Sequence, residues 1–161
     1  MKLTDIRRLT AQLTPELARR DPALYHTMLR SLGYEPGNLY QELEMESKYV
    51  DTHQDTSWNN AHVSLHSHTF YEILCCRNTC GAEYLVGSER YRVQKGDIIL
   101  IAPGISHRPL LPAHMTEPYV RDVVWVSPEF MRSMCIWFPE LLDHVGRENN
   151  LLRVEEPVRE E

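Results

Sequence analysis

The chain has 161 residues, enough for one domain with a sizeable hydrophobic core. Hydrophobic residues make up 42% of it and charged residues 25%, the usage of an ordinary globular protein, and no apolar run approaches the roughly 18 residues of a membrane span. Basic residues number 17 against 23 acidic ones, for a formal net charge of −6 and no basic stripe. We therefore do not expect this chain itself to contact nucleic acid.

The N-terminal stretch, residues 1–13, carries charges throughout and lacks the apolar segment and cleavage site of a signal peptide. We therefore expect a cytoplasmic protein, with no membrane contact and with reduced cysteines. The spacing of the four cysteines is not that of a zinc site, and the neighbours Cys75 and Cys76 would point to opposite faces of a strand. They are interpreted as small, buried apolar residues.

Residues 1–33 are predicted to be helical, with several helix starts. Thr4 is a candidate cap for the first helix, and Thr14-Pro15-Glu16 and Asp21-Pro22 are typical of later starts, because proline is favoured at the first helical position. Gly33 fits the position just after a helix end. We expect these helices to cover the outer face of a sheet, and the alternative is a lid or a partner-binding segment.

The following residues indicate a β protein. Residues 41–50 could form a strand or a short helix, and the polar residues 51–60 are expected to be a loop. Over 62–127, short apolar runs alternate with turn residues, which is typical of an all-β sandwich or barrel. The expected strands are 70–77, 83–86, 90–93, 98–102 and 119–126, with turns at Gly87-Ser88, Lys95-Gly96-Asp97 and Pro103-Gly104.

Ser127-Pro128-Glu129 predicts the start of a helix, with a capping serine, a proline in the first turn and an acid at the positive end of the helix dipole. Its apolar face is expected to carry Phe130, Met134 and Phe138, with Gly146 ending the helical region and residues 149–154 forming one more strand. The chain is accordingly divided into a helical extension and linker (1–61), a barrel core (62–127) and C-terminal helices with the end of the domain (128–161).

The strongest chemical pattern is the stretch 66–72 together with a later histidine. His66 and His68 lie two residues apart and would share one face of a strand, and Glu72 has the same parity. His107 follows a strand that ends in a Pro-Gly turn, so it lies at a strand end and can point inward. Imidazole and carboxylate ligands suit Zn, Fe(II), Mn or Ni.

The alternative is that these residues are satisfied polar groups of the core. A buried carboxylate needs some partner, whether a cation, a ligand or a protonated imidazole. Arginine partners for Glu72 are also available in the sequence: Arg77, Arg92 and Arg108.

The remaining histidines and the tyrosines carry weaker expectations. His62 is a possible addition to the site, and the others are treated as surface residues: His26, His53, His114 and His144. Tyr71, Tyr84 and Tyr91 lie on expected strands and are expected to pack in the core, although tyrosines that line a barrel often stack on sugars. Of these, Tyr84 is the candidate for contact with a ligand.

His66-x-His68-x3-Glu72, followed by the stretch 96–107 with His107 at its end, resembles the two motifs of the cupin superfamily. The detailed match, over about residues 62–154, is to the N-terminal sensor domain of AraC-type transcriptional regulators, and the Ser-Pro-Glu helix start also resembles that family. The cupin pattern is not complete: Asn60 replaces a glycine, the glycine expected after Glu72 comes late at Gly81, and Pro103-Gly104 replaces Pro-x-Gly. These departures weaken the case for a catalytic cupin.

The resemblance implies a double-stranded, jelly-roll-like β-barrel that binds a small effector, possibly a sugar, and takes part in homodimerisation. It implies no catalytic activity. It assigns His66, His68, Glu72 and His107 as effector contacts and as ligands of a divalent metal, if one is bound, and it places DNA binding in a C-terminal helix-turn-helix domain that this chain does not contain. The alternative is a small metal-dependent cupin enzyme, of dioxygenase or isomerase type.

Overall fold

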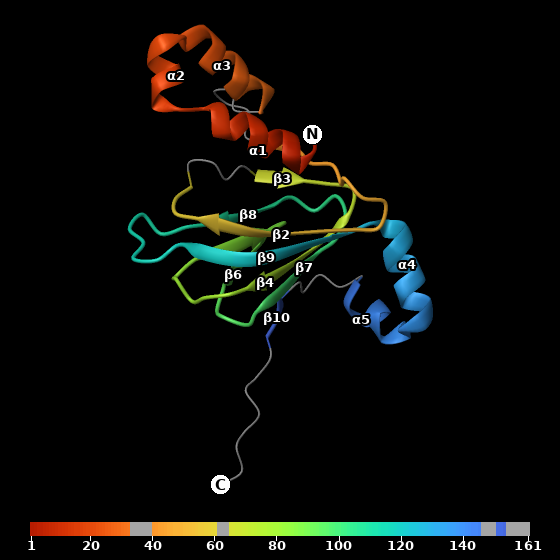
Figure 1. Ribbon diagram of the computed structural model, residues 1–161. Helices are drawn as coiled ribbons and strands as arrows, with labels where there is room; N and C mark the ends of the chain where they lie inside the picture. Colours follow the sequence, from red (N-terminus) through yellow and green to blue (C-terminus); the bar gives the residue numbers. More distant parts are fainter. Residues whose placement is uncertain (33–39, 61–64, 146–150, 154–161) are drawn as a thin grey trace.

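The computed structural model describes residues 1–32, 40–60, 65–145 and 151–153. The described residues form two five-stranded sheets with helices at both ends of the chain (Figure 1), so the prediction of a mainly β fold is confirmed. The first sheet contains β1 (Tyr40–Glu42), β3 (Leu65–Ser67), β8 (His107–Leu110), β5 (Glu83–Val86) and β6 (Glu89–Arg92), in that order. The second contains β10 (Leu151–Leu152), β7 (Ile98–Ile101), β4 (Tyr71–Cys76), β9 (Tyr119–Val126) and β2 (Val50–Ser57).

The hydrophobic core lies between the two sheets. Burial alternates residue by residue along β4 and β9, because successive side chains of a strand point to opposite faces. One cluster of buried side chains joins β4, β5, β7 and β9, with Leu74, Tyr84, Ile99 and Val123 among its members. The strands predicted between residues 70 and 126 are therefore confirmed, each within one or two residues of its expected bounds.

The turns that connect these strands also follow the prediction. Gly87 lies in the two-residue loop between β5 and β6 with a φ of +59°, and Gly96 precedes β7 with a φ of +88°. Both values lie in the left-handed region, which a glycine enters without the steric cost that other residues meet. These turns set the pairing of β5 with β6 and of β4 with β7.

The prediction of a loop at residues 51–60 is wrong, because β2 occupies most of it and pairs with the full length of β9. Its side chains alternate between half-buried and exposed, as in a strand with one inward face. That inward face is polar, with Asp51, His53, Asp55 and Ser57, so the alternation is not one of apolar and polar residues. The segment 41–50, which could be strand or helix, contains the end of β1, a connection and the start of β2.

Three N-terminal helices are present: α1 (Leu3–Gln12), α2 (Pro15–Arg20) and α3 (Pro22–Ser31). Thr14 and Asp21 cap α2 and α3 with their side chains, as predicted, but the cap of α1 is Lys2 rather than Thr4. The amide of Thr4 instead donates to Glu46. Gly33 lies outside the described residues.

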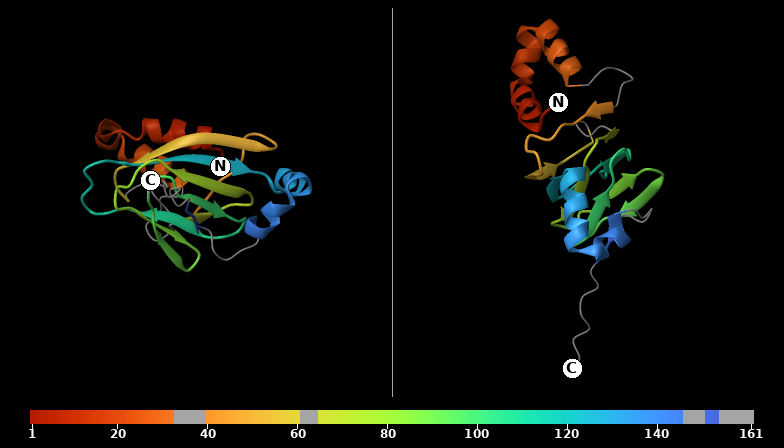
Figure 2. Two further views of the ribbon diagram at one scale, coloured as in Figure 1. Left: turned by 90° about the horizontal axis from the view of Figure 1, so that it is seen from below. Right: turned by 90° about the vertical axis from the view of Figure 1, so that its right-hand side faces the viewer.

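The helices do not cover a sheet face, contrary to expectation, and lie beyond β1 and β3 at one side of the molecule (Figures 1 and 2). Their own small core contains Leu17, Met28 and Leu32. Because these apolar side chains pack among the helices themselves, the helices need no sheet surface to bury them.

The helix α4 (Pro128–Trp137) begins where the sequence predicts, with Ser127 accepting a hydrogen bond from the amide of Phe130. Its buried residue is Met131, and Phe138 of the predicted apolar face is 48% exposed. A 3-10 turn, η1 (Pro139–Leu141), and α5 (Leu142–Val145) follow, whereas Gly146 lies outside the described residues. The expected last strand is reduced to β10 among the described residues.

No helix within the described ranges combines the length and apolar character that a membrane crossing requires.

Candidate metal and ligand site

The four residues singled out from the sequence meet inside the fold. His66 lies on β3 opposite His107, the first residue of β8, while His68 follows β3 and Glu72 lies on β4 of the other sheet. One ligand atom from each side chain lies within 4.8 Å of those of the other three. His68, Glu72 and His107 are buried. A bend at Thr69 and Phe70 separates His68 from Glu72, and it lets both residues point to the same interior.

The orientation of two imidazoles is fixed by backbone carbonyls. The Nδ1 atom of His68 lies 2.8 Å from the carbonyl oxygen of Phe70, and that of His107 lies 2.7 Å from the carbonyl oxygen of Ile105. Because a carbonyl only accepts, each Nδ1 carries a hydrogen, and in the neutral ring Nε2 is left with a free lone pair. This outer hydrogen bond is the usual arrangement around a metal-binding histidine.

Both Nε2 lone pairs are directed toward the carboxylate of Glu72. Its Oε2 atom lies 2.8 Å from Nε2 of His107 and 3.7 Å from Nε2 of His68. Within the described part of the chain, none of these three buried atoms makes a hydrogen bond of good geometry. Two neutral imidazoles and a carboxylate that converge in this way repel one another unless a proton or a cation lies between them. The donor set therefore fits a divalent cation.

The other oxygen of Glu72 has a partner in the protein. The indole Nε1 of Trp125 donates to Oε1 over 2.8 Å, and the three arginines considered as alternatives do not take this place. Arg77, for example, pairs with Asp122. Burial alone would raise the pKa of Glu72, but hydrogen bonding to His107 and His68, which requires a proton on the ring nitrogens that face the carboxylate, outweighs it and holds that pKa well below its usual range. The carboxylate is therefore ionised.

Aromatic rings enclose the imidazoles. The ring of Phe70 stacks on His68 with 4.0 Å between centroids, and the ring of Tyr84 lies roughly parallel to His107 at 6.3 Å. Burial, followed by the negative charge of Glu72, raises the pKa of Tyr84 well above its usual value. Tyr84 thus keeps its hydroxyl proton in the interior, whereas Tyr71 and Tyr91 are only half-buried.

A groove on the surface lies next to this interior, with His68 in its wall. It is lined by residues of three segments, namely the connection after β1, the end of β3 and the turn before β8: Leu43, Glu44, Ser67, His68, Thr69, Pro103 and Gly104. The side chain of His68 is fully buried, so the groove meets this residue at its backbone.

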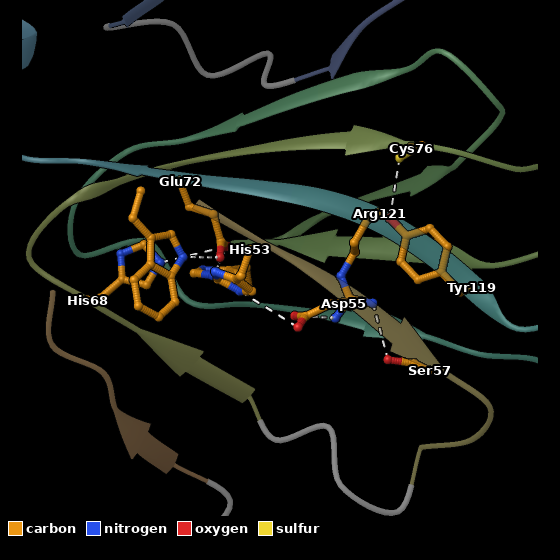
Figure 3. Close-up of polar contacts among 10 residues, drawn as sticks. His53, Asp55, Ser57, His68, Glu72, Cys76, Tyr119 and Arg121 are labelled. Carbon is orange, nitrogen blue, oxygen red and sulfur yellow. Dashed lines mark hydrogen bonds and ion pairs between the residues drawn. The ribbon is translucent and has the colours of Figure 1, made fainter. Parts of the chain in front are cut away.

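A second polar cluster, which the sequence did not reveal, lies on the inner face of the second sheet (Figure 3). We call it the β2 cluster, and it consists of His53, Asp55, Ser57 and Arg121. The expectation that His53 is a surface residue is wrong, because its side chain is 6% exposed and its ring meets that of Trp125 edge-on at 4.9 Å. The sequence offered no signal for it, because residues 51–57 are all polar and show no alternation of apolar and polar residues.

Arg121 organises this cluster. Its Nη2 atom lies 3.2 Å from Asp55 Oδ2, its Nη1 donates to Ser57 Oγ over 3.1 Å, and its guanidinium lies 4.9 Å from the ring centre of Tyr119. Burial raises the pKa of Asp55, but His53 and Arg121 together outweigh it, so the net shift is downward. The ion pair of Asp55 and Arg121 is therefore formed at neutral pH.

The other histidines and the cysteines lie largely where they were expected. His26, His114 and His144 are exposed, and His62 lies outside the described residues. Cys75 and Cys76 point to opposite faces of β4, and Cys76, which contacts the hydroxyl of Tyr119, is buried. The other three cysteines are half-buried rather than buried, and all four are free thiols.

A family model described as the AraC-like ligand binding domain matches residues 47–157. A search of curated proteins gave no match.

Similar solved structures include a cupin 2 conserved barrel domain protein from Salinispora arenicola, with 20% identity, a TM-score of 0.43, and coverage of 55% of this chain and 71% of that one. ToxT from Vibrio cholerae shows 15% identity, a TM-score of 0.42, and coverage of 65% and 42%. Salicylate 1,2-dioxygenase from Pseudoaminobacter salicylatoxidans shows 13% identity, a TM-score of 0.43, and coverage of 55% and 24%. The matched region thus makes up less than half of each of the last two chains.

Proposed function

Because the chain belongs to the family of AraC-like ligand binding domains, we propose that it is the ligand-sensing part of a transcription regulator. It binds a small effector inside the barrel and controls a helix-turn-helix domain outside this sequence. The observation that carries the proposal is the convergence of His68, Glu72 and His107, whose buried atoms are left unsatisfied by the described residues. A bound cation or ligand would stabilise an interior of this kind, because buried polar atoms without partners destabilise a protein.

The proposed contacts with the effector are the four residues of the His–Glu site and Tyr84, whose hydroxyl remains protonated. His66, His68, Glu72 and His107 would also hold a divalent cation such as Zn, Ni, Fe or Mn. When bound, such a cation supplies a Lewis acid to an oxygen or nitrogen atom of the effector. The indole of Trp125 leaves only one oxygen of Glu72 for this role.

Signalling requires that the effector bind two conformations with different affinity. The groove at His68 offers a route by which binding could be transmitted to the N-terminal helices, because its wall includes Glu44. The amide of Glu44 donates to the carbonyl of Met1 over 3.0 Å, and Lys2 forms a β-bridge with Glu44. A ligand in the groove therefore contacts the segment that is hydrogen-bonded to the start of the chain. Its binding is transmitted through this pairing to α1 and the other N-terminal helices.

The test is a thermal-shift screen of the purified chain against divalent cations and fractionated small-molecule extracts. Binding to the native state raises the melting temperature, because it stabilises the fold by an amount that grows with the logarithm of the ligand excess, about 2.7 kcal/mol at a hundredfold excess over Kd. We expect at least one cation or metabolite to stabilise the chain and His107→Ala to abolish that response. His114→Ala, at an exposed position, is the matched control and keeps it. Absence of any stabilising compound, or an equal response of His107→Ala, refutes the proposal.

A metal-dependent enzyme of dioxygenase or isomerase type is the second candidate, favoured by the complete set of three histidines and one glutamate. A measurement of turnover distinguishes the enzyme from the sensor. An enzyme loaded with Fe(II) consumes a stabilising compound in the presence of oxygen or converts it to an isomer, whereas a sensor returns it unchanged.

We also propose that the chain forms a homodimer and acts in the cytoplasm. The support for the dimer is an apolar surface around the end of α4, where Ile136 is 77% and Trp137 is 79% exposed, with Phe138 and Leu142 beside them. Large exposed apolar side chains gathered in one place are typical of an interaction surface.

A further inference from the structure

The charge of this protein is divided unevenly between its N-terminal helices and its barrel. Residues 1–32, which contain α1 to α3, have six basic and three acidic residues, whereas the rest of the chain has eleven basic and twenty acidic ones. The helical part is therefore positive, at +3, and the remainder is negative, at −9. The net charge of −6 for the whole chain conceals this separation, which is typical of proteins that bind nucleic acids or membranes.

The positive charges of the helices are exposed and mostly unpaired. All six basic side chains are exposed: Lys2, Arg7, Arg8, Arg19, Arg20 and Arg30. Within the described part of the chain, Arg8 forms an ion pair with Asp5, and the other five have no acid at ion-pair distance. The side chain of Asp21 is occupied as the cap of α3. The helices therefore present a positive surface to solvent.

Helical periodicity directs arginines away from the packed side of each helix. Arg19 follows the buried Leu17 by two positions, which is about 200° around the helix axis. Arg30 follows the buried Met28 by the same interval. On α1, Arg7 precedes a half-buried leucine by two positions. Each of the three helices thus carries an arginine on its outward side.

The position of the helices leaves this surface accessible. Figures 1 and 2 show α1 to α3 beyond β1 and β3, projecting away from the barrel. Acidic groups of the barrel that lie further than about 8 Å away are largely screened at physiological ionic strength. Among the side chains that the structure describes in these helices, Leu24 is the large apolar one left exposed. An interface with a protein or a membrane would need more apolar surface, so the arginines fit phosphate groups best.

We propose that α1 to α3 bind the phosphate backbone of duplex DNA, without reading its sequence, beside the site of the helix-turn-helix domain. The inference rests on the proposed function, which brings this chain to DNA. A guanidinium group donates two parallel hydrogen bonds to a phosphate, and such contacts position a protein on the duplex. Because Lys2 pairs with Glu44 in the groove wall, effector binding and DNA contact meet at the start of α1.

The test measures the anisotropy of a labelled duplex of about 24 base pairs, titrated with the chain in 50 to 200 mM KCl. Three phosphate contacts predict that the affinity falls about fortyfold over this range, and a duplex of shuffled sequence should bind equally well. Arg7→Gln/Arg30→Gln removes two of these contacts and should lower the slope of log affinity against log salt by about 1.8. Arg90→Gln/Arg92→Gln, which removes two exposed charges of β6, is the matched control and should leave the slope unchanged.

Absence of binding at 50 mM KCl overturns the proposal, as does an equal change of slope in the two double variants. Vesicles with one quarter phosphatidylglycerol are the second probe, and tighter binding to them than to DNA would assign the surface to a membrane instead. Melting curves verify the fold of both variants, and the salt dependence of the wild-type chain tests the proposal without any substitution.

The proposed sensing function is tested separately by the thermal-shift screen. If the chain does not bind DNA while that screen finds a stabilising ligand, the DNA-binding surface is wrong and the sensing function stands. If the chain binds DNA through its helices while the screen finds no ligand, the surface stands and the sensing function falls.

Discussion

Trp125 is the residue outside the His–Glu site on which the charge state of that site most depends. Its indole donates the hydrogen bond that satisfies one oxygen of the ionised Glu72. Trp125→Phe keeps an aromatic ring but leaves that oxygen without a partner, and we expect it to lower the free energy of unfolding by about 2–3 kcal/mol. Urea denaturation followed by circular dichroism measures the change. Trp58→Phe, at a residue that is 56% exposed, should stay within about 0.5 kcal/mol. Equal effects of the two substitutions would contradict this account of Trp125.

At the scale of the elements, β10 is held to the second sheet by a side chain. Arg153 donates to both oxygens of Asp97 over 2.8 and 2.7 Å, and Asp97 lies at the turn before β7. Burial would raise the pKa of Asp97, but the hydrogen bonds from Arg153 and from the amide of Gln94 outweigh it, so its pKa is lowered on folding. The resulting stabilisation is complete above the unfolded pKa of about 3.9 and is lost as the pH falls through the lower, folded value.

Melting curves from pH 7 down to the acid range test the stabilisation by the ion pair of Arg153 and Asp97. Arg153→Ala should melt below the wild type near neutral pH, and the gap should close as the pH falls below about 4. Arg8→Ala, which breaks an exposed pair with Asp5 on α1, should have little effect at any pH. A gap that persists in acid would mean that Arg153 acts through packing rather than through Asp97.

The elements also show which parts of this fold a sequence can reveal. Strands β4, β5, β6, β7 and β9 and helix α4 were predictable because apolar runs alternate with turn residues or a capping serine precedes a proline, whereas β8 was missed because it is short and contains Pro109. Strand β2 was not, because its inward residues are charged or polar, and their partner Arg121 lies 66 positions away from Asp55. His53 was missed for the same reason. By contrast, the convergence of the His–Glu site was predictable, because strand parity groups His66 and His68 with Glu72 and the resemblance to the cupin motifs adds His107.

For the molecule as a whole, the apolar surface at the end of α4 predicts an association between copies. Ile136→Ser/Trp137→Ser removes its two most exposed side chains, and we expect it to convert the proposed dimer to a monomer in light scattering coupled to gel filtration. Leu24→Ser, at a residue 45% exposed on α3, is the control and should leave the mass unchanged. A wild-type chain that is monomeric, or a double variant that remains dimeric, would exclude this surface as the interface.

The polar inner face of β2 has a consequence for solubility. A strand at the end of a sheet offers unpaired backbone groups to any neighbouring chain, and an apolar strand in that place invites aggregation. In β2 an inward ion pair, Asp55 with Arg121, and the exposed Thr52, Gln54 and Thr56 make such stacking unfavourable. Replacing the ion pair by well-packed aliphatic residues could make the isolated fold more stable while it makes concentrated solutions prone to fibre formation. The ion pair of Asp55 and Arg121 therefore also protects the edge of the sheet from association with other chains.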